Sequence, residues 1–313
     1  MKLKIGNQVI NMPDFFVVGA PKCGTTSLYD YLKMSTKLFL PEIKEPQFFA
    51  YKNLGNQFKS VNSPNNVKTR NFIIHLKDYQ KLFLKASNNQ IIGDFSTHYL
   101  RYSNSFIENI KEVYGDRVAE LKIIILLRDP IDRAFSHYTM RLRDNNENLT
   151  FREAVNPKII EDRLKDNYLP SYDYLRFSQY KKDIDNLKNT FPLCKIYHFK
   201  DFITDTENVL KDLSSFLEIQ DDLKIILNQN FQESNISGVP KRGILNHVFF
   251  TVIFRKNLIK SFIPVKIRKR YRSQVKTTIG KKLMFKPKIT SSEREYLESL
   301  LCEEIETFEN FKY

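Results

Sequence analysis

The sequence lacks tryptophan, disulfide-type cysteine spacing and long hydrophobic runs, and these absences exclude several classes of protein. Its three cysteines, Cys23, Cys194 and Cys302, lie far apart in a chain of 313 residues, which argues against a disulfide framework and favours a reducing compartment. The five histidines show no metal-ligand spacing, so the sequence predicts no metal site. Residues 1–12 lack the apolar core of a signal peptide, and no run of about 18 apolar residues occurs. We therefore expect a cytoplasmic protein without a membrane-spanning helix.

Acidic residues are missing from one long window, residues 234–292. This window contains fifteen lysines and arginines, so it accounts for the net charge of +14, and the rest of the chain is close to neutral. The segment 241–288 is basic and apolar, and three interpretations of it stay open. Residues 244–272 could form an interfacial helix on the inner face of the cell membrane, bind an acidic polysaccharide, or pack their apolar side chains into the core. No recognition motif supports nucleic acid as a partner.

Glycine is also scarce, yet two of the nine glycines, Gly19 and Gly24, lie in one short segment. Residues 15–19 form an apolar, β-rich run that predicts a buried strand, and residues 26–34 have the apolar spacing of a helix. A strand, a tight loop and a helix in this order are typical of a phosphate-binding loop, because the free N–H groups and the positive dipole end of the helix face the anion. An ordinary strand–helix turn is the alternative.

The loop differs from the P-loop of nucleotide-hydrolysing enzymes in the position of its lysine. Thr25 stands where that loop has its lysine, and Lys22 lies inside the loop instead. This difference argues against triphosphate hydrolysis. The candidate anion-binding residues are Lys22, Cys23, Gly24, Thr25, Thr26 and Ser27.

A second candidate anion-binding loop follows the clearest strand pattern in the chain, residues 121–127. Arg128 comes directly after this strand, where α/β sheets bind their ligands. Ser136 lies eight residues further on, about two turns into a predicted helix that continues to residue 144. A guanidinium and a hydroxyl suit a phosphate. The alternative is that Arg128 pairs with Asp129 or Asp132 to hold the turn.

The remaining patterns complete an α/β fold. Further strands are predicted at residues 90–94 and 194–199, and further helices at 174–191, 206–217 and 288–308. Residues 53–71 are polar and asparagine-rich, which predicts a surface insertion of low order. Alternating strands and helices indicate a P-loop-like three-layer fold with a central, mostly parallel β-sheet flanked by helices. We expect one domain over residues 1–313, with the basic segment 241–288 and a terminal helix at about 290–308.

Taken together, these motifs resemble those of a known family. The segments Pro-Lys-Cys-Gly-Thr-Thr-Ser at 21–27 and Leu-Leu-Arg-Asp-Pro-Ile-Asp-Arg-Ala-Phe-Ser-His-Tyr at 126–138 are similar to those of sulfotransferases that use 3′-phosphoadenosine 5′-phosphosulfate. The resemblance is strongest to the heparan-sulfate-type and bacterial carbohydrate branch. It extends from about residue 15 to residue 239 and includes the segments 44–49, 93–96, 178–192 and 235–242.

The resemblance implies a role for individual residues. Lys22, Gly24, Thr25, Thr26 and Ser27 correspond to the family's 5′-phosphosulfate loop. Arg128 and Ser136 correspond to its 3′-phosphate pair. Lys241, Arg242 and Gly243 resemble the family's late basic loop, which closes over the nucleotide. Glu45 matches the acidic residue that acts as general base in the glycan-directed branch.

Chemistry supports Glu45 independently, because an attacking hydroxyl or amine must lose a proton. Its alternative is a solvated loop charge. The glycan-directed enzymes often carry a lysine where this chain has Phe95, so a second catalytic cation is missing or is supplied elsewhere, with Lys44 as the candidate. His98 is a reserve candidate for the base, and its alternative is a pocket or surface residue.

The resemblance therefore implies a metal-independent bacterial enzyme that moves a sulfuryl group from the donor nucleotide to a carbohydrate acceptor. The acceptor would be a polysaccharide, a glycolipid or a lipid-linked glycan, and the product would be adenosine 3′,5′-bisphosphate. Two other functions stay open. One is a nucleotide-dependent kinase, against which the missing P-loop lysine argues, and the other is a non-catalytic nucleotide- or polyanion-binding module.

Overall fold

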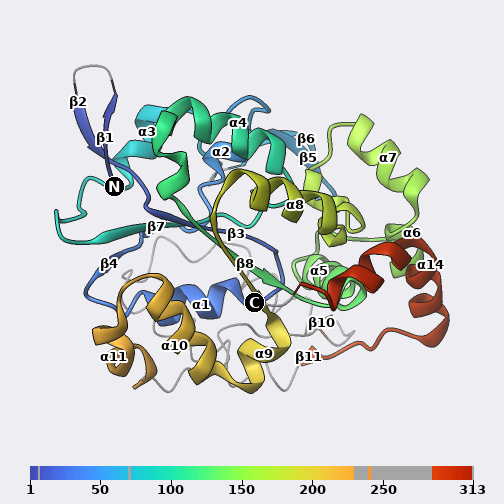
Figure 1. Ribbon diagram of the computed structural model, residues 1–313. Helices are drawn as coiled ribbons and strands as arrows, with labels where there is room; N and C mark the ends of the chain where they lie inside the picture. Colours follow the sequence, from blue (N-terminus) through green and yellow to red (C-terminus); the bar gives the residue numbers. More distant parts are fainter. Residues whose placement is uncertain (6–7, 70–71, 229–238, 241–283, 312–313) are drawn as a thin grey trace, which may run out of the picture.

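A computed structural model of the chain describes residues 1–5, 8–69, 72–228, 239–240 and 284–311. Its centre is a sheet of five parallel strands in the order β4–β7–β3–β8–β9 (Figure 1). The strands are β3 (Phe15–Gly19), β4 (Leu38–Phe39), β7 (Ile91–Phe95), β8 (Lys122–Leu127) and β9 (Leu193–His198). The predicted α/β fold with a central parallel sheet is confirmed. The segment 244–272 lies outside the described residues.

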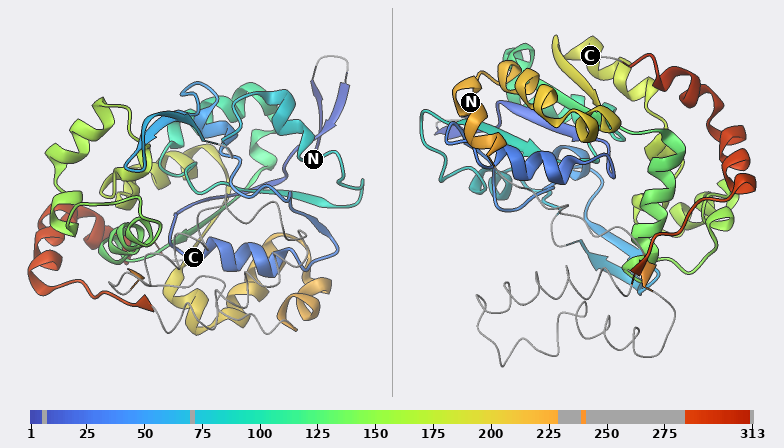
Figure 2. Two further views of the ribbon diagram at one scale, coloured as in Figure 1. Left: turned by 180° about the vertical axis from the view of Figure 1, so that it is seen from behind. Right: turned by 90° about the horizontal axis from the view of Figure 1, so that it is seen from below.

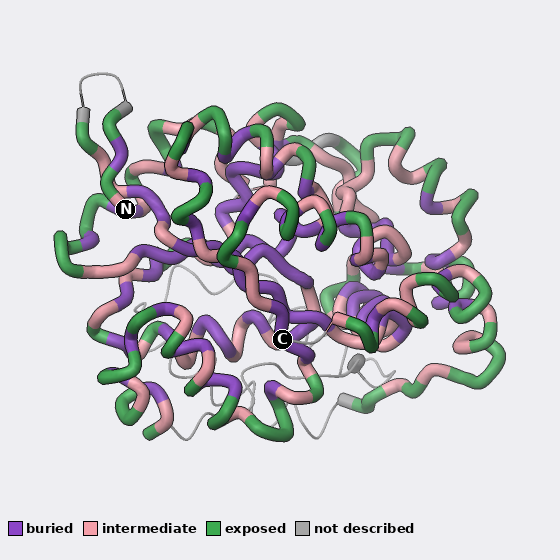
Figure 3. Tube along the Cα trace, viewed as in Figure 1, coloured by how far each residue is buried: buried purple, intermediate pink, exposed green. Residues whose placement is uncertain are grey.

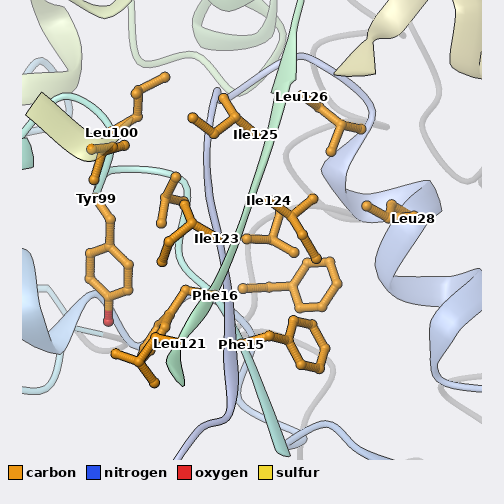
Figure 4. Close-up of a cluster of buried hydrophobic side chains, with 14 of the residues drawn as sticks. Phe15, Phe16, Leu28, Tyr99, Leu100, Leu121, Ile123, Ile124, Ile125 and Leu126 are labelled. Carbon is orange, nitrogen blue, oxygen red and sulfur yellow. The ribbon is translucent and has the colours of Figure 1, made fainter. Parts of the chain in front are cut away.

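The sheet forms the core because its middle strands are apolar on both faces. All five residues of β3 are buried, and β8 is buried from its second residue onward. Ile123 and Ile125 of β8 point to the side of Tyr99, whereas Leu126 points to the side of Leu28 (Figure 4). Burial is concentrated along these strands (Figure 3). Helices therefore have to cover both faces of the sheet, as in other parallel sheets.

Two groups of helices cover the sheet, one on each face (Figures 1 and 2). One group consists of α1 (Thr25–Leu32), α9 (Phe199–Thr204), α10 (Thr206–Phe216) and α11 (Leu223–Leu227). The other consists of α2 (Phe48–Tyr51), α3 (Leu76–Lys81), α4 (Ser103–Tyr114) and α8 (Lys181–Thr190). Four short 3₁₀ helices span Gly115–Glu120, Pro170–Tyr172, Arg176–Ser178 and Gln220–Asp222.

A second apolar cluster lies beyond the sheet, where α5 (Pro130–Arg143) packs beside α14 (Ser291–Phe308). Ile131 and Tyr138 of α5 share this cluster with Leu297 of α14. The helices α6 (Phe151–Ala154) and α7 (Pro157–Lys165) extend the same region. The predicted C-terminal helix is confirmed as α14, and Thr290 and Glu293 form the capping box at its start.

Small antiparallel pairs lie outside the central sheet. They are β1 (Lys2–Ile5) with β2 (Gln8–Asn11), β5 (Gln57–Ser60) with β6 (Ser63–Lys68), and β10 (Val239–Pro240) with β11 (Met284–Phe285). The surface insertion predicted at 53–71 is more ordered than expected in its described part, because β5 and β6 form a hairpin there. The centroids of its Phe58 ring and the Tyr51 ring lie 5.8 Å apart, and Lys59 N donates a hydrogen bond to Asn167 O at 2.9 Å.

The predicted helix at 174–191 is shorter than expected and begins at Lys181. The helix begins there because a residue far away in the sequence caps its first N–H groups. The carboxylate of Glu304 accepts hydrogen bonds from Tyr180 N at 2.7 Å and from Lys181 N at 3.0 Å. These are donors at the start of a helix that have no partner within it.

Candidate active site

The predicted anion-binding residues meet at one edge of the sheet. Because all five strands are parallel, their carboxyl ends lie at the same edge, where α/β folds bind their ligands. Lys22 follows β3, Glu45 follows β4, His98 follows β7 and Arg128 follows β8. The topology therefore brings together four segments that are far apart in the sequence.

The loop after β3 has the backbone of a tight anion cradle. Lys22 and Gly24 both adopt left-handed conformations, with φ values of 74° and 85°. Gly24 is the N-cap of α1, so the first N–H groups of this helix point out of its end. A side chain at Gly24 would meet the Phe199 ring, because an ideal Cβ there lies 2.9 Å from a ring carbon. The position requires glycine for its conformation and for this close approach.

Lys22 is a cation held in a largely buried place. Among the described residues its Nζ forms no ion pair, and it donates to Met140 Sδ at 3.4 Å, which is a weak acceptor. Burial, followed by the repulsion of the Arg143 guanidinium, lowers the pKa of Lys22 to about 8. An unpaired, desolvated ammonium of this kind favours binding of an anion.

Cys23 points the other way, into the protein. Its side chain is fully buried, and burial raises the pKa of the thiol to about 11. The thiol is therefore neutral and contributes no charge to the cradle.

Phe199, at the start of α9, joins the two candidate loops. Its ring lies against Gly24 on one side, and the guanidinium of Arg128 lies 5.3 Å from the ring centroid. Arg128 also approaches Asp132, with an Nη2–Oδ2 distance of 3.8 Å, as the alternative interpretation required. The pair is half exposed, so it leaves the guanidinium available to a ligand. Ser136 lies on α5 and is partly exposed.

A buried arginine braces the second loop from behind. Arg133 is fully buried, and it donates to Ser178 Oγ at 2.6 Å and to Tyr174 O at 2.5 Å. Ser178 in turn donates to Pro130 O at 2.8 Å, and Tyr180 OH donates to Arg128 O at 3.1 Å. This brace fixes the direction in which the chain leaves β8.

Lys44 connects the loop that carries Glu45 to the anion cradle. Its Nζ donates to Thr26 Oγ1 at 2.7 Å and lies 3.5 Å from Glu45 Oε1. The same ammonium lies 5.9 Å from the centroid of the Tyr29 ring. Phe95, by contrast, is buried and packs edge-on against Tyr29 at 5.3 Å. The structure thus has an apolar ring at position 95 and a cation from Lys44 beside the cradle.

The conformation of the Glu45 loop is unusual for its sequence. Glu45 and Gln47 have φ values of 60° and 56°, in the left-handed region that non-glycine residues seldom adopt. Glu45 N donates to Phe95 O at 3.0 Å, which ties the loop to the end of β7. The side chain of Glu45 is 35% exposed, so its carboxylate can reach a substrate.

His98 has the environment of a structural histidine. It is 9% exposed, and its Nδ1 pairs with Tyr51 OH at 2.8 Å. Burial, followed by the charges of Arg141 and Arg101, lowers the pKa of His98 to about 3. A histidine with this pKa is neutral and weakly basic, which favours the pocket role over the general-base role.

Three further expectations concern the late basic loop at 241–243, metal binding and membrane-spanning helices. Lys241, Arg242 and Gly243 lie outside the described residues. Within the described part of the chain, no group of three or more His, Cys, Asp or Glu side chains has the arrangement of a metal site. Among the same residues, no helix is long and apolar enough to cross a membrane.

The sequence analysis did not identify two features of the site: Phe199, and the hydrogen-bonded brace of Arg133, Ser178 and Tyr180. The position of Phe199 directly after a strand of the sheet was a usable signal, since that is where ligand-binding residues gather. The burial of Arg133 was harder to foresee, because two of its hydrogen-bond partners, Ser178 and Tyr174, lie more than forty positions away in the sequence.

Known proteins resemble the chain in sequence and in structure. A family model described as the sulfotransferase domain matches residues 12–243. Carbohydrate sulfotransferase 15 from mouse (Mus musculus) is 28% identical over 205 residues, which cover 56% of this chain and 35% of the mouse protein. The human (Homo sapiens) protein of the same name is 27% identical over 205 residues, with the same coverage. The chain thus spans about a third of the length of these curated relatives.

A solved structure resembles most of the chain. The crystal structure of a sulfotransferase from Alicyclobacillus acidocaldarius superimposes with a TM-score of 0.61 at 27% sequence identity. The match covers 79% of this chain and 92% of that one.

Proposed function

Because the chain belongs to the sulfotransferase family, we propose that it transfers a sulfuryl group from 3′-phosphoadenosine 5′-phosphosulfate to a hydroxyl or amine of a carbohydrate. The names of its curated relatives support a carbohydrate acceptor. The acceptor would be a polysaccharide, a glycolipid or a lipid-linked glycan.

The loops after β3 and β8 would bind different parts of the donor nucleotide. The cradle at the start of α1 binds the 5′-phosphosulfate through backbone N–H groups and the hydroxyls of Thr26 and Ser27. Arg128 and Ser136 bind the 3′-phosphate, and Phe199 holds the two loops together through its contacts with Gly24 and Arg128. Lys241, Arg242 and Gly243, which lie outside the described residues, would contribute further contacts to the nucleotide.

The reaction breaks one S–O bond and forms a new S–O bond to a hydroxyl or a new S–N bond to an amine. The acceptor oxygen or nitrogen attacks sulfur, its proton passes to the carboxylate of Glu45, and the bond from sulfur to the bridging phosphate oxygen breaks. The electron pair of that bond stays on the departing adenosine 3′,5′-bisphosphate. Lys22 stabilises the charge that develops on this leaving oxygen. A sulfuryl group carries less charge than a phosphoryl group, so this chemistry requires no Mg²⁺.

Lys44 would serve as the second cation. Its hydrogen bond to Thr26 sets it against the cradle, and its ion pair with Glu45 sets it beside the proposed base. An ammonium between these two groups offsets the negative charge of the sulfuryl oxygens as transfer proceeds. This contact is the single observation that carries the proposal, because it joins the donor cradle to the residue that would deprotonate the acceptor.

The test is sulfuryl transfer from radiolabelled donor in the presence of EDTA. The acceptors are dextran, chitosan and hyaluronan, which offer neutral hydroxyls, amines and an acidic polysaccharide. Label in at least one polysaccharide, lost by about 100-fold or more in Glu45→Gln, supports the proposal. The matched control is Glu42→Gln, which changes an exposed carboxylate three residues away. A Glu45→Gln protein as active as the wild type would remove Glu45 as the base. Phosphoryl transfer from ATP would instead support the kinase, and nucleotide binding without transfer would support the binding module.

A further inference from the structure

We infer that Asp94 is a positioning residue that sets the conformation of the loop carrying Glu45. This inference rests on the proposed function, because it concerns the orientation of the proposed base, Glu45. Asp94 is the fourth residue of β7 and is fully buried, so it touches neither solvent nor substrate. Its effect would act through the loop alone.

Three hydroxyl groups surround the carboxylate of Asp94. Tyr79 OH and Tyr99 OH donate to Oδ2 at 2.6 and 2.8 Å, and Ser96 Oγ donates to Oδ1 at 2.7 Å. All three donors are buried. A buried carboxylate is unfavourable unless hydrogen bonds satisfy it, and these three contacts supply them.

Two of the three hydroxyls also accept hydrogen bonds from backbone N–H groups, one at the end of the Glu45 loop and one in the first turn of α2. Ser96 Oγ accepts from Gln47 N at 3.1 Å, and Tyr99 OH accepts from Phe49 N at 3.4 Å. Tyr79 does not contact the loop backbone in this way, although its ring stacks on Phe48. Asp94 thus reaches the backbone at the end of the loop, at Gln47, and in the first turn of α2, at Phe49, each through one hydroxyl.

The direction of these hydrogen bonds follows from the chemistry of an ionised carboxylate. A carboxylate only accepts, so each hydroxyl must turn its hydrogen toward Asp94. The lone pairs of Ser96 and Tyr99 are then left facing the N–H groups of Gln47 and Phe49. A neutral amide at position 94 could donate to one hydroxyl and turn that hydroxyl's hydrogen toward the loop.

The loop needs such support because its backbone is disfavoured. Glu45 and Gln47 both have positive φ values, which non-glycine residues adopt only when the surroundings hold them. The hydrogen bond from Gln47 N to Ser96 Oγ holds the backbone at the second of these positions, directly before α2. Burial raises the pKa of Asp94 to about 6, against the hydrogen bonds of Tyr79, Ser96 and Tyr99, so the carboxylate is mainly ionised at pH 7.

The first experiment measures hydrogen exchange of the Gln47 and Phe49 amides by NMR. The variants are Asp94→Asn and Ser96→Ala, and the matched control is Tyr79→Phe, which removes a hydroxyl from Asp94 but leaves both links to the loop. We expect exchange at Gln47 to rise at least tenfold in Asp94→Asn and Ser96→Ala, and to change less than threefold in Tyr79→Phe. Unchanged exchange in Ser96→Ala, which tests the inference even if Asp94→Asn does not fold, would overturn it.

The second experiment is a double-mutant cycle in the transfer assay. It uses whichever polysaccharide of dextran, chitosan and hyaluronan accepts label fastest. We expect Asp94→Asn to lower kcat at least tenfold in the wild type and less than threefold in a Glu45→Gln background, with unchanged affinity for adenosine 3′,5′-bisphosphate. Equal losses in both backgrounds would show that Asp94 does not act through Glu45.

The two experiments separate the inference from the proposed function. If Glu45→Gln retains full activity, the proposed base is wrong, and amide exchange alone decides whether Asp94 positions the loop. If Glu45→Gln is inactive and exchange is unchanged in Asp94→Asn and Ser96→Ala, the base stands and the inference about Asp94 fails.

Discussion

The ammonium of Lys44 donates a hydrogen bond of 2.7 Å to Thr26 Oγ1, although the two residues are eighteen positions apart. Thr26 belongs to the first turn of α1, and Lys44 precedes the proposed base in the loop after β4. Their contact ties the loop that carries the proposed base to the proposed donor cradle. It also places a cation beside the cradle, whereas the side chain at position 95 is the buried, apolar ring of Phe95.

Replacing Lys44 by methionine should lower kcat by about 10²-fold, because the sulfuryl oxygens lose a preorganised cation. Affinity for adenosine 3′,5′-bisphosphate should change much less, since this product lacks the sulfuryl group. The matched control is Lys33→Met, because Lys33 also lies near the Tyr29 ring, at 5.5 Å, but is exposed. Transfer assays and calorimetry would measure both effects. Equal activity in the two variants would exclude the role of Lys44.

Gly24→Ala should destabilise the protein more than Gly55→Ala. Both glycines have positive φ values, of 85° and 79°, so both substitutions incur roughly 1–2 kcal/mol of backbone strain. Only at Gly24 does the new methyl group meet the Phe199 ring, whereas Gly55 has open space. We expect an additional loss of about 1–3 kcal/mol at Gly24, measured by denaturant unfolding, together with weaker nucleotide binding. Equal destabilisation would mean that the contact with Phe199 is easily relieved.

The alkaline side of the pH profile should report Lys22. Its pKa of about 8 means that the ammonium loses its proton as pH rises through that value, and a neutral amine cannot stabilise the leaving oxygen. We expect kcat/KM for the donor to fall tenfold per pH unit above about 8, since this parameter reports the free enzyme. Cys23 does not complicate this range, because burial raises its pKa to about 11. In Lys22→Arg, any remaining activity should not decline there. A flat wild-type profile to pH 9.5 would contradict this assignment.

The sequence allowed the central sheet and the two loops to be predicted because their signals are local. β3 and β8 are largely apolar runs; Arg128 follows β8 directly, and Lys22 lies three residues after the end of β3. Parallel pairing then places both residues at one edge of the sheet, whatever the rest of the chain does. The fold class and the position of the candidate site follow from these few features.

The parts that could not be predicted depend on contacts between distant segments. The start of α8 is set by Glu304, more than a hundred residues away, so local periodicity placed it too early. The burial of His98 likewise arises from Tyr51 and from aromatic rings such as Phe177, 4.8 Å away. The resemblance to sulfotransferases made His98 a reserve candidate for the base, and its surroundings favour a structural role.

The most direct test of the donor site is isothermal titration of the purified chain with adenosine 3′,5′-bisphosphate, without metal, beside a titration with ATP and Mg²⁺. The account predicts tight binding of the bisphosphate, weak binding of ATP, and a bisphosphate affinity reduced at least tenfold in Arg128→Ala, because a guanidinium–phosphate contact is lost. A preference for ATP, or binding of neither nucleotide, would contradict it.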